Sequence, residues 1–509
     1  MISIEEMANF CKRRGFIYPN SEIYGSISGF FDYGPLGVEL KNNIKKEWWK
    51  YHVHSREDVV GIDSSIITHP KVWEASGHLN FFQDIMVECE NCHERYRADQ
   101  LIEQKTKERA DVPSIKKIVS LMKKYKIKCT NCGKDTLSNP MPFNLMFQSF
   151  VGAKEDKGSV VWLRPETAQS IFVNFNLVQE NARLKLPFGI AQIGKAFRNE
   201  ISPRHFLFRL REFEQMEIEY FVHPEKRNDC PYIDDISHEE ISIYSAEMQE
   251  NNSKPKKMTM KEALNKKIIK NQWHAYWLIM EYKWFISLGA NNNNFRIRQH
   301  LKDELSHYSS DTWDLEYNFP FGWKELLGVA DRGDFDLKQH MKYSKKDLSL
   351  FDEESKKKIL PHVIAEPSLG VDRAFLVFMY DAYYYDKERK NVVLKLCPKL
   401  APVQVAIFPL LSNREGLINK SKEVFDLLKE DFNCFYDVSG SIGRRYYRQD
   451  EIGTLYGITI DFETLKNHDV TIRERNTQKQ IRVKIKNLKD IIDKLLNNKI
   501  AFEKAGKLI

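Results

Sequence analysis

The chain has 509 residues, more than one hydrophobic core usually serves, so at least two domains are expected. Apolar residues make up 42% of the sequence and charged residues 29%, a balance typical of a globular protein and not of a disordered or fibrous one. The formal net charge of +7 is modest for this length and is compatible with a nucleic acid partner and equally with an ordinary soluble enzyme.

The expected cellular location follows from sequence patterns that the chain lacks. The first residues lack the apolar stretch of a secretory signal, and no run of apolar residues is long enough for a spanning helix, so no membrane partner is expected. Four of the eight cysteines form two close pairs and the other four are scattered, which argues against a disulfide framework. We therefore expect a cytoplasmic protein in a reducing compartment.

The first half of the chain divides into a catalytic region and an insertion. Residues 1–85 begin with an amphipathic helical pattern and continue, after a Gly-rich stretch, as a helical run at 38–52. Residues 86–142 hold both cysteine pairs around a Lys/Glu-rich middle with helical periodicity near 115–125, and they are expected to form a Cys-rich insertion. Short apolar runs separated by polar turns then predict antiparallel strands from 143 to about 222.

A second insertion and a second domain follow. Residues 223–295 are expected to be a variable insertion, polar at first and then helical in the Trp-rich segment 272–288. Residues 401–509 alternate apolar runs with amphipathic helices at 417–429 and 488–496, which predicts a separate α/β domain. The prediction is an α+β protein with a catalytic domain at 1–400 and an α/β domain at 401–509.

The most specific local pattern is Phe197-Arg-Asn-Glu200 followed by Arg209-Leu-Arg-Glu-Phe213. It resembles motif 2 of the class II aminoacyl-tRNA synthetases, in which two antiparallel strands and their loop hold ATP. Carboxylate attack on the α-phosphorus of ATP places negative charge on phosphate oxygens, and planar guanidinium groups meet that charge bidentately. The alternative is a solvated strand face whose charges pair with one another.

A second string, Glu366-Pro-Ser-Leu-Gly-Val-Asp-Arg373, precedes an apolar run and resembles motif 3 of the same class. The absence of a Cβ at Gly370 lets the backbone approach a nucleotide, and Arg373 is expected to cover the adenine. Ser368 replaces the first glycine of the class pattern, as in the glycyl branch. A simple strand-to-helix turn capped by Ser368 is the other interpretation.

The glycyl-tRNA synthetase family is indicated by three further strings, Arg164-Pro-Glu-Thr-Ala-Gln169, the run 213–217, and the segment 322–332. The resemblance implies an α+β class II catalytic domain with an antiparallel sheet, a zinc-ribbon-like insertion and a C-terminal anticodon-binding domain. It also implies ATP-dependent ligation of glycine to its tRNA through an enzyme-bound glycyl-adenylate, with release of AMP and pyrophosphate. The segment 69–84 looks like motif 1 of the family, which implies a homodimer.

Site residues follow from this resemblance, with Arg198, Glu200, Arg209 and Arg373 in catalytic roles. Those expected at ATP and its Mg²⁺ are Arg198, Asn199, Glu200, Phe208, Arg209, Leu210, Arg211, Glu212, Phe213, Glu325, Leu326, Gly370, Val371, Asp372 and Arg373. Those expected at glycine are Arg97, Glu166, Phe213, Glu214, Gln215, Met216, Glu217, Arg332, Glu366, Pro367, Ser368, Leu369 and Gly370. Within this set the glutamates are expected to bind the ammonium group, and Arg332 the carboxylate.

The two cysteine pairs, Cys89-x2-Cys92 and Cys129-x2-Cys132, could supply four thiolates to one structural Zn²⁺. Their separation exceeds the usual spacing, and the Lys-rich helix between them could form an arm that touches tRNA. Redox chemistry is the alternative, although neither pair lies in a βαβ context.

The C-terminal region 402–509 resembles the anticodon-binding domain of several class II synthetases. Basic and aromatic residues alternate at 444–448, where Arg444, Arg445, Tyr446, Tyr447 and Arg448 are expected to contact the tRNA for glycine. A solvated cationic turn is the alternative. For the whole chain, two other functions stay open: a catalytically inactive binding protein on the same scaffold, and an enzyme specific for proline, threonine, serine or histidine.

Overall fold

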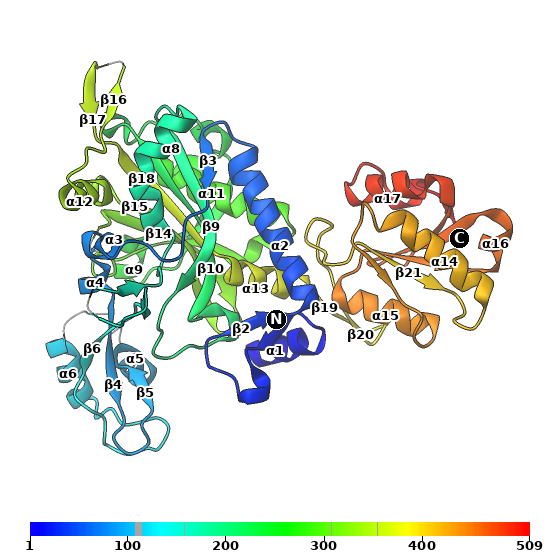
Figure 1. Cartoon of the computed structure of the whole chain (residues 1–509), viewed down its shortest axis with the longest axis horizontal. Helices are drawn as coiled ribbons and strands as arrows, with labels where there is room; N and C mark the ends of the chain where they lie inside the picture. Colours follow the sequence, from blue (N-terminus) through cyan, green and yellow to red (C-terminus); the bar gives the residue numbers. More distant parts are fainter. Residues whose placement is uncertain (107–114, 157, 307, 354) are drawn as a thin grey trace.

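A computed structural model describes residues 1–106, 115–156, 158–306, 308–353 and 355–509 of the chain. It confirms the predicted α+β class: a large N-terminal body is built on a mostly antiparallel sheet, and a smaller C-terminal body lies beside it (Figure 1). Among the described residues, no helix has the length and apolar character required to cross a membrane.

The central sheet of the larger body has nine strands in the order β12-β11-β13-β14-β15-β18-β10-β9-β3. Neighbouring strands are antiparallel except for the parallel pairs β3 with β9 and β11 with β13. The strands are β3 (Val59–Ile62), β9 (Phe188–Phe197), β10 (Glu212–Val222), β11 (Glu240–Tyr244), β12 (Lys256–Thr259), β13 (Phe295–Gln299), β14 (Asp311–Phe319), β15 (Gly322–Asp331) and β18 (His362–Gly370).

Four helices enclose this sheet: α1 (Ile4–Arg13), α2 (Pro35–Trp49), α11 (Gln272–Ser287) and α13 (Val371–Ala382). Ser3 and Glu6 form a capping box at the start of α1, and Pro35 occupies the first turn of α2. α2 continues as a π-helical turn (Lys50–His54). α11 packs against β14, β15 and β18, and buried residues occur on nearly all sides of this helix.

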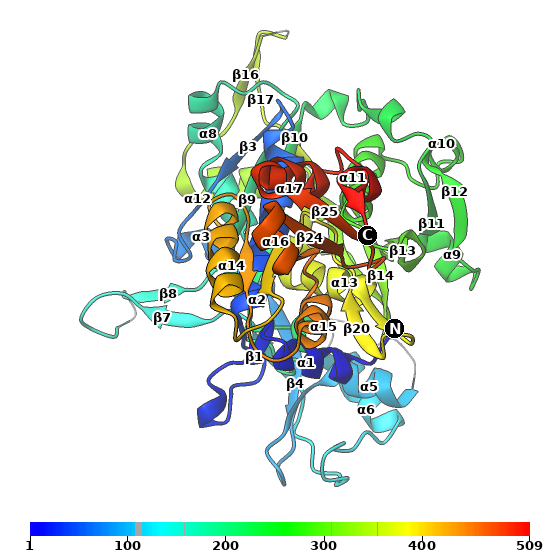
Figure 2. The same cartoon turned by 90° about the vertical axis from the view of Figure 1, so that its right-hand side faces the viewer.

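Other helices of the larger body lie around the sheet. They are α3 (Lys71–Ala75), α4 (His78–Phe81), α7 (Ala168–Val173), α8 (Phe175–Ala182), α9 (Ala246–Glu250), α10 (Met260–Asn265) and α12 (Phe335–Ser344). Three small hairpins complete the body: β1 (Ile17–Pro19) with β2 (Phe31–Tyr33), β7 (Gln148–Phe150) with β8 (Val160–Trp162), and β16 (Leu350–Asp352) with β17 (Lys357–Ile359). The β7–β8 hairpin projects from the body (Figure 2).

Residues 223–295, expected to be a variable insertion in the catalytic domain, form part of the central sheet. They contribute β11, β12 and the start of β13 to one edge of the central sheet, and α11 to its face. The buried tryptophans of α11 belong to the same core as the strands of the active region. This segment is therefore structurally integral to the catalytic domain.

The Cys-rich region 86–142 has a small core of its own, and its part at 107–114 lies outside the described residues. It contains β4 (Gln83–Glu88), β5 (Arg95–Arg97), β6 (Met141–Asn144), α5 (Ala98–Thr106) and α6 (Ile115–Lys124). β4 is the central strand of a three-stranded sheet, and α5 packs on α6. Ile118 of α6 contributes to this core, while its lysines leave the helix strongly amphipathic.

The C-terminal body has a separate core around a six-stranded sheet of order β22-β21-β23-β24-β25-β26. Its strands are β21 (Val405–Pro409), β22 (Cys434–Tyr436), β23 (Tyr456–Ile460), β24 (Asp469–Glu474), β25 (Gln480–Lys484) and β26 (Lys507–Leu508). Its helices are α14 (Glu415–Leu428), α15 (Ile442–Ile452), α16 (Phe462–Asn467) and α17 (Leu488–Leu496). The basic and aromatic run 444–448 lies on α15, so it is helical and not a turn.

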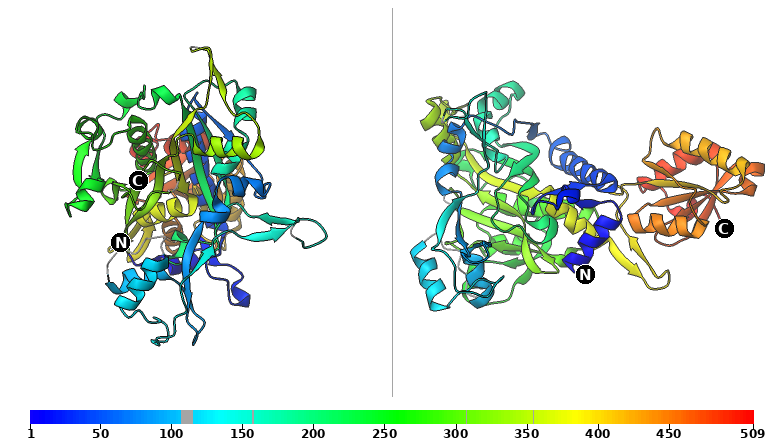
Figure 3. Two further views of the ribbon diagram at one scale, coloured as in Figure 1. Left: turned by 90° about the vertical axis from the view of Figure 1, so that its left-hand side faces the viewer. Right: turned by 60° about the horizontal axis from the view of Figure 1, so that its bottom comes forward.

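One hairpin of the larger body, β19 (Tyr383–Asp386) with β20 (Asn391–Leu394), lies against the C-terminal body (Figures 1 and 3). β20 packs on α15, and β19 follows α13 without an intervening loop. The two bodies are therefore joined by this hairpin as well as by the chain itself.

Candidate active site

A cavity of about 340 Å³ lies over the middle of the central sheet, on strands β10, β15 and β18 and under the loop between β9 and β10. Many residues expected at ATP or glycine line it together. They are Glu166, Arg198, Glu200, Phe208, Arg209, Leu210, Phe213, Gln215, Glu217, Glu325, Leu326, Glu366, Ser368, Gly370, Asp372 and Arg373. Strings separated by up to 200 residues in the sequence thus meet at one cavity.

Strand pleating decides which residues of the motif strings reach this cavity. Side chains alternate between the faces of a strand, so Phe213, Gln215 and Glu217 of β10 line the cavity. Glu214 and Met216, also expected at glycine, do not line the cavity for the same reason. Glu214 forms ion pairs with Lys41 and Lys45 on the opposite face, and Met216 is fully buried in the core.

The same alternation applies to β18. Glu366, Ser368 and Gly370 line the cavity, whereas Pro367 and Leu369 do not, and Leu369 belongs to the core. The register between the two strands places Ser368 opposite Glu217 and Gly370 opposite Gln215. The amide of Gln215 donates a hydrogen bond to the Ser368 hydroxyl at 3.1 Å.

Three arginines surround the end of the cavity where ATP is expected. The guanidinium of Arg198 lies over the Phe82 and Phe213 rings, 5.4 and 5.3 Å from their centroids, and donates to the Pro165 carbonyl at 3.1 Å. Arg209 lies 3.6 Å from the carboxylate of Glu200. These contacts fix both guanidinium groups at the cavity wall.

The third arginine is Arg373, in the first turn of α13. It lies over the Phe208 ring at 4.5 Å, and its Nη1 is 3.2 Å from the Glu325 carboxylate. Desolvation of its carboxylate acts to raise the pKa of Glu325, but the nearby cations Arg373 and His300 outweigh it and hold that pKa below its ordinary value. Glu325 is thus an ionised carboxylate beside the arginine-rich end of the cavity.

Four residues expected at ATP lie outside the lining. The Asn199 backbone N–H donates to the Leu145 carbonyl, and Arg211 donates to the carbonyls of Glu200 and Ser28. Glu212 pairs with Lys195 at the surface, and Val371 is fully buried in the core. The structure gives Asn199, Arg211, Glu212 and Val371 positions that shape the loop and helix around the cavity.

At its other end, the cavity is acidic. Glu166, Glu217 and Glu366 are all buried, and Glu166 lies 3.2 Å from the ring of His78. Burial opposes ionisation of Glu166, but His78 and Arg332 outweigh it and hold its pKa below the ordinary value. Burial and the neighbouring Glu166 raise the pKa of Glu217.

Burial also raises the pKa of Glu366 to about 8; Arg332 opposes this increase, and Glu217 and Glu166 reinforce it. Glu366 receives a hydrogen bond from Arg332 at 2.6 Å. Arg332 also donates twice to Asp336, at 2.8 and 2.9 Å, and lies 3.9 Å from the Tyr308 ring centroid. Arg332 is 2% exposed and does not line the cavity, so the expected direct contact with a substrate carboxylate is not supported. In this structure, it orients Glu366.

Arg97, which was expected at glycine, also lies away from the acidic end of the cavity. It forms ion pairs with Asp84 at 3.2 Å and Asp99 at 2.6 Å, and it lines a second cavity beside the first. His300, Ser306, Asp314 and Glu325 line both cavities. Arg97 therefore belongs to the neighbouring wall and not to the acidic end.

Gly194 and Arg164 fix the segment that presents Glu166. The Arg164 side chain donates to the carbonyls of Lys195 at 2.6 Å and Ser64 at 2.8 Å. Its guanidinium fills the space beside Gly194, where an added Cβ would lie 2.1 Å from Nη2. Glycine is therefore required here by a close approach.

Sequence reasoning missed several residues of the site. Glu219 lies with Glu217 and Glu366 in a group of buried carboxylates whose oxygens are within 4.8 Å of one another. His300 Nε2 donates to the Asp314 carboxylate at 2.8 Å, and although burial opposes it, this contact raises the pKa of His300 to about 9. The continued alternation of acids along β10 could have indicated Glu219. His300 directly follows β13 and Asp314 lies on β14, so no local pattern joined them.

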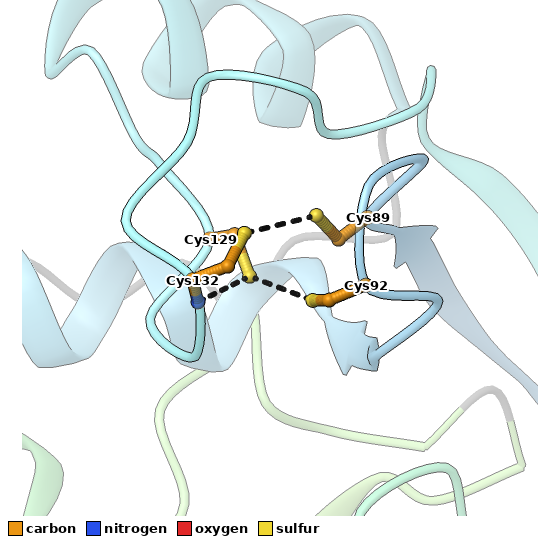
Figure 4. Close-up of side chains that lie close together, drawn as sticks. All are labelled: Cys89, Cys92, Cys129 and Cys132. Atoms are coloured by element: carbon orange, nitrogen blue, oxygen red, sulfur yellow. Dashed lines mark hydrogen bonds between the residues drawn. The ribbon is translucent and has the colours of Figure 1, made fainter.

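The four cysteines of the insertion converge (Figure 4). Cys89 and Cys132 are 3.6 Å apart at sulfur, and Cys92 and Cys129 are 3.5 Å apart. Tetrahedral zinc with bonds of about 2.3 Å requires sulfurs about 3.8 Å apart, close to this spacing. The donor set and its arrangement thus fit Zn²⁺.

Both cysteine pairs are presented by equivalent turns. The Cys89 N–H donates to the Glu94 carbonyl and the Cys129 N–H to the Lys134 carbonyl, while the N–H groups of His93 and Gly133 donate back to Cys89 and Cys129. His93 and Gly133 both have positive φ, at 57° and 71°. Two matching knuckles thus supply the four thiol groups.

The residues expected at tRNA divide into exposed and buried sets. Arg444 and Tyr447 are exposed, and Arg448 is half-exposed and pairs with Asp437 at 2.6 Å. Arg445 is 1% exposed, and its guanidinium donates to the carbonyls of Pro409 and Gly440. The expected phosphate contact of Arg445 is therefore not supported, since its side chain stabilises the domain interior.

Tyr446 is also partly enclosed. Its hydroxyl lies 2.7 Å from the Thr459 hydroxyl, and the Arg473 guanidinium lies 4.8 Å from its ring centroid. Its side chain therefore packs between α15 and the sheet.

Comparison with known proteins agrees with this arrangement. Residues 152–383 match the family described as tRNA synthetase class II core domain (G, H, P, S and T), and residues 404–495 match the anticodon binding domain. The Glycine--tRNA ligase of Geobacillus thermodenitrificans is 45% identical over 510 residues, covering 98% of each chain. Those of Acetivibrio thermocellus and Clostridium kluyveri are each 44% identical, over 494 and 501 residues, covering 96% of this chain and 97% and 98% of their own. The near-complete coverage and both domain matches agree with the cavity at which the motif strings meet. The chain belongs to the glycine--tRNA ligase family.

Proposed function

We propose that the central cavity is where this chain performs the family's reaction, the ATP-dependent attachment of glycine to tRNA. In the first step the glycine carboxylate attacks the α-phosphorus of ATP, forming glycyl-adenylate and releasing pyrophosphate. In the second, a terminal ribose hydroxyl of tRNA attacks the glycyl carbonyl and AMP leaves. The observation that carries the proposal is a single cavity with arginines at one end and buried glutamates at the other.

The arginine-rich end is suited to adenylate formation. The Arg198 guanidinium lies over the Phe213 ring on β10, the strand that also presents Glu217, so we assign it to the α-phosphate, where charge accumulates during attack. Arg209 is assigned to the terminal phosphates. Arg373 and Phe208 stack on each other and together offer a flat surface for adenine.

ATP brings Mg²⁺, which neutralises charge on the departing pyrophosphate. Glu325 and Glu200 are two of the carboxylates that line the cavity near its arginines, and the lowered pKa of Glu325 keeps it ionised. We assign Glu325 to the nucleotide with its metal ion. Glu200 also holds Arg209 in place.

The acidic end is suited to the ammonium group of glycine. A buried carboxylate is costly without a cation, and Glu217 and Glu366 have raised pKa values in the absence of substrate. An ammonium group among Glu166, Glu217 and Glu366 supplies a further cation beside Arg332. Ser368 and Gln215 form the floor next to it.

We assign the exclusion of larger amino acids to the same acidic end of the cavity. A tolerant pocket gains only about 1–3 kcal/mol of discrimination from one methyl group, whereas a rigid, crowded one rejects it by overpacking. Here the carboxylates are held by Thr167, His78 and Arg332, so the pocket has little freedom to expand.

Amino-acid-dependent ATP–pyrophosphate exchange tests the proposal. Exchange should require glycine and should not occur with alanine, serine, threonine, proline or histidine. Exchange that requires one of these amino acids instead of glycine would show that the enzyme is specific for that amino acid. No exchange with any of them, in a protein that binds tRNA, would establish an inactive binding protein.

We also propose a structural Zn²⁺ at Cys89, Cys92, Cys129 and Cys132. The support is their convergent sulfurs and the two matching knuckles. Metal analysis of the purified protein should find about one zinc per chain. Cys92→Ser should lower that content and the melting temperature, whereas Cys434→Ser, a partly buried cysteine far from the cluster, should not change the zinc content.

Contacts with the tRNA for glycine are assigned to the exposed side chains Arg444, Tyr447 and Arg448, and to the lysines of α6. An Arg444→Ala variant should weaken tRNA binding and reduce its dependence on salt. Pyrophosphate exchange should be unchanged, because that step does not need tRNA.

A homodimer is the final part of the proposal. The segment expected to be motif 1 forms α3 and α4, and next to it Ile66, Ile67 and Phe81 are exposed. Sedimentation should give twice the chain mass, and Phe81→Glu should shift the protein toward the monomer. A cytoplasmic location is proposed because all eight cysteines are unpaired thiols.

A further inference from the structure

The hairpin β19–β20 lies between the catalytic cavity and the proposed tRNA-binding surface on α15. On one side it follows directly on α13, whose first turn carries Arg373 at the cavity. On the other side it packs on α15, which carries Arg444, Tyr447 and Arg448 (Figures 1 and 2). Two helices and one hairpin therefore connect the proposed adenine site with the proposed tRNA surface.

A buried carboxylate joins the hairpin to α15. Asp450, 1% exposed, accepts hydrogen bonds from both terminal nitrogens of Arg473, at 2.9 and 3.0 Å. It also accepts one at 3.2 Å from Arg389, in the turn between β19 and β20. Because a buried charge is costly to leave without its partners, Asp450 favours the docked position of the hairpin.

Backbone contacts reinforce this ion pair in both directions. Arg389 donates to the carbonyls of Arg475 at 2.8 Å and Asn476 at 2.7 Å, in the C-terminal domain. Arg475 in turn donates to the carbonyl of Leu396, just after β20, at 2.8 Å. The two arginines are 9% and 2% exposed, so water competes little with these bonds.

The end of α15 is equally close to the hairpin. Gly453 ends the helix with φ +88°, and a Cβ there would lie 3.1 Å from the Leu394 carbonyl of β20. Near the middle of α15, the Asn391 side chain donates to the Tyr447 carbonyl at 3.2 Å. The hairpin thus contacts the very residue whose side chain is exposed for tRNA.

We propose that Arg389 and Asp450 are positioning residues that hold α15 in a fixed orientation to the catalytic cavity, so that contact with the anticodon arm promotes glycyl transfer. The inference rests on the proposed function. Neither residue touches ATP or glycine, and their effect is confined to tRNA that engages both domains.

The test compares a full-length tRNA for glycine with a minihelix of its acceptor stem, which lacks the anticodon arm. In Arg389→Ala, kcat/KM for the full-length tRNA should fall about 10-fold, within the usual range of coupling between two sites. Charging of the minihelix and glycine-dependent pyrophosphate exchange should stay unchanged. Lys387→Ala is the matched control, because it removes a cation from the same turn where the side chain is exposed.

Equal losses on both RNAs, or no loss on either, would overturn the inference, as would an unaltered enzyme that charges both RNAs equally well. Absence of any charging by the unaltered enzyme would instead refute the proposed function. Thermal unfolding identifies variants that fail to fold. Should Arg389→Ala be one of them, Asn391→Ala removes a single bond to α15 and is measured in the same way, with the same outcomes deciding.

Discussion

Glu366 should give glycine activation a distinctive pH dependence. Burial raises its pKa to about 8, with Arg332 opposing the increase, and only its ionised form attracts an ammonium group. A carboxyl group with that pKa is ionised in roughly a tenth of molecules at pH 7 and in roughly nine-tenths at pH 9. The kcat/KM for glycine should therefore rise roughly 10-fold between these pH values.

Replacing Glu366 by glutamine should remove this dependence. Glutamine keeps a hydrogen-bonding oxygen for Arg332 but has no charge for the ammonium. A hydrogen bond to a charged group is worth about 1.5–3 kcal/mol, so KM for glycine at pH 9 should rise about 10- to 150-fold. At pH 6 the two enzymes should differ little, because Glu366 is then protonated in the unaltered enzyme.

The assay is ATP–pyrophosphate exchange from pH 6 to 9, with glycine expressed as its zwitterion and KM for ATP measured in parallel. Glu180→Gln, at an exposed position of α8, is the control and should follow the unaltered profile. A flat profile in the unaltered enzyme would refute the reasoning. So would a Glu366→Gln enzyme whose activity rises with pH in the same way.

Three other substitutions have distinct expected outcomes. Gly194→Ala should lower the free energy of unfolding by about 1–3 kcal/mol in urea titration, because its Cβ would displace the Arg164 guanidinium; an unchanged midpoint would contradict the close approach. Arg198→Ala should slow pyrophosphate exchange by roughly 10²–10³-fold with an unchanged melting temperature, and normal exchange would exclude the α-phosphate role. Arg445→Ala should destabilise the C-terminal domain by about 1–3 kcal/mol, since it removes buried bonds such as the one to Pro409. Weakened tRNA binding by a fully stable Arg445→Ala protein would restore the role first expected from the sequence.

Local patterns predicted much of the site because each motif string folds on a single strand or turn. The strings at 197–200 and 209–213 became the ends of β9 and β10, and the string at 366–373 became the junction of β18 with α13. Several of the expected residues that do not line the cavity were assigned as consecutive residues of one strand. Glu214 and Leu369 belong to motif strings that reach the cavity. Because successive side chains of a strand point to opposite faces of the sheet, these two point away from it.

Other features depend on contacts between distant segments, which no local pattern reveals. The strands β11 and β13 pair although α9, β12, α10 and α11 lie between them in the sequence, so 223–295 gave the signal of an insertion while completing the sheet. Arg332 and Arg445 were given ligand roles by resemblance, Arg332 to a substrate contact of the family and Arg445 to a basic and aromatic tRNA-binding run. Their partners, Asp336 and the carbonyl of Pro409, are brought into place only by the tertiary fold.

The position of β12 at one end of the central sheet bears on how the protein behaves in solution. A strand with a free edge offers unpaired N–H and carbonyl groups to any other extended chain, and natural proteins discourage this with charged side chains, lysine above all. Lys256 and Lys257 are both exposed on β12. Their repulsion should keep two copies from joining edge to edge, so the sheet can be nine strands wide without promoting aggregation.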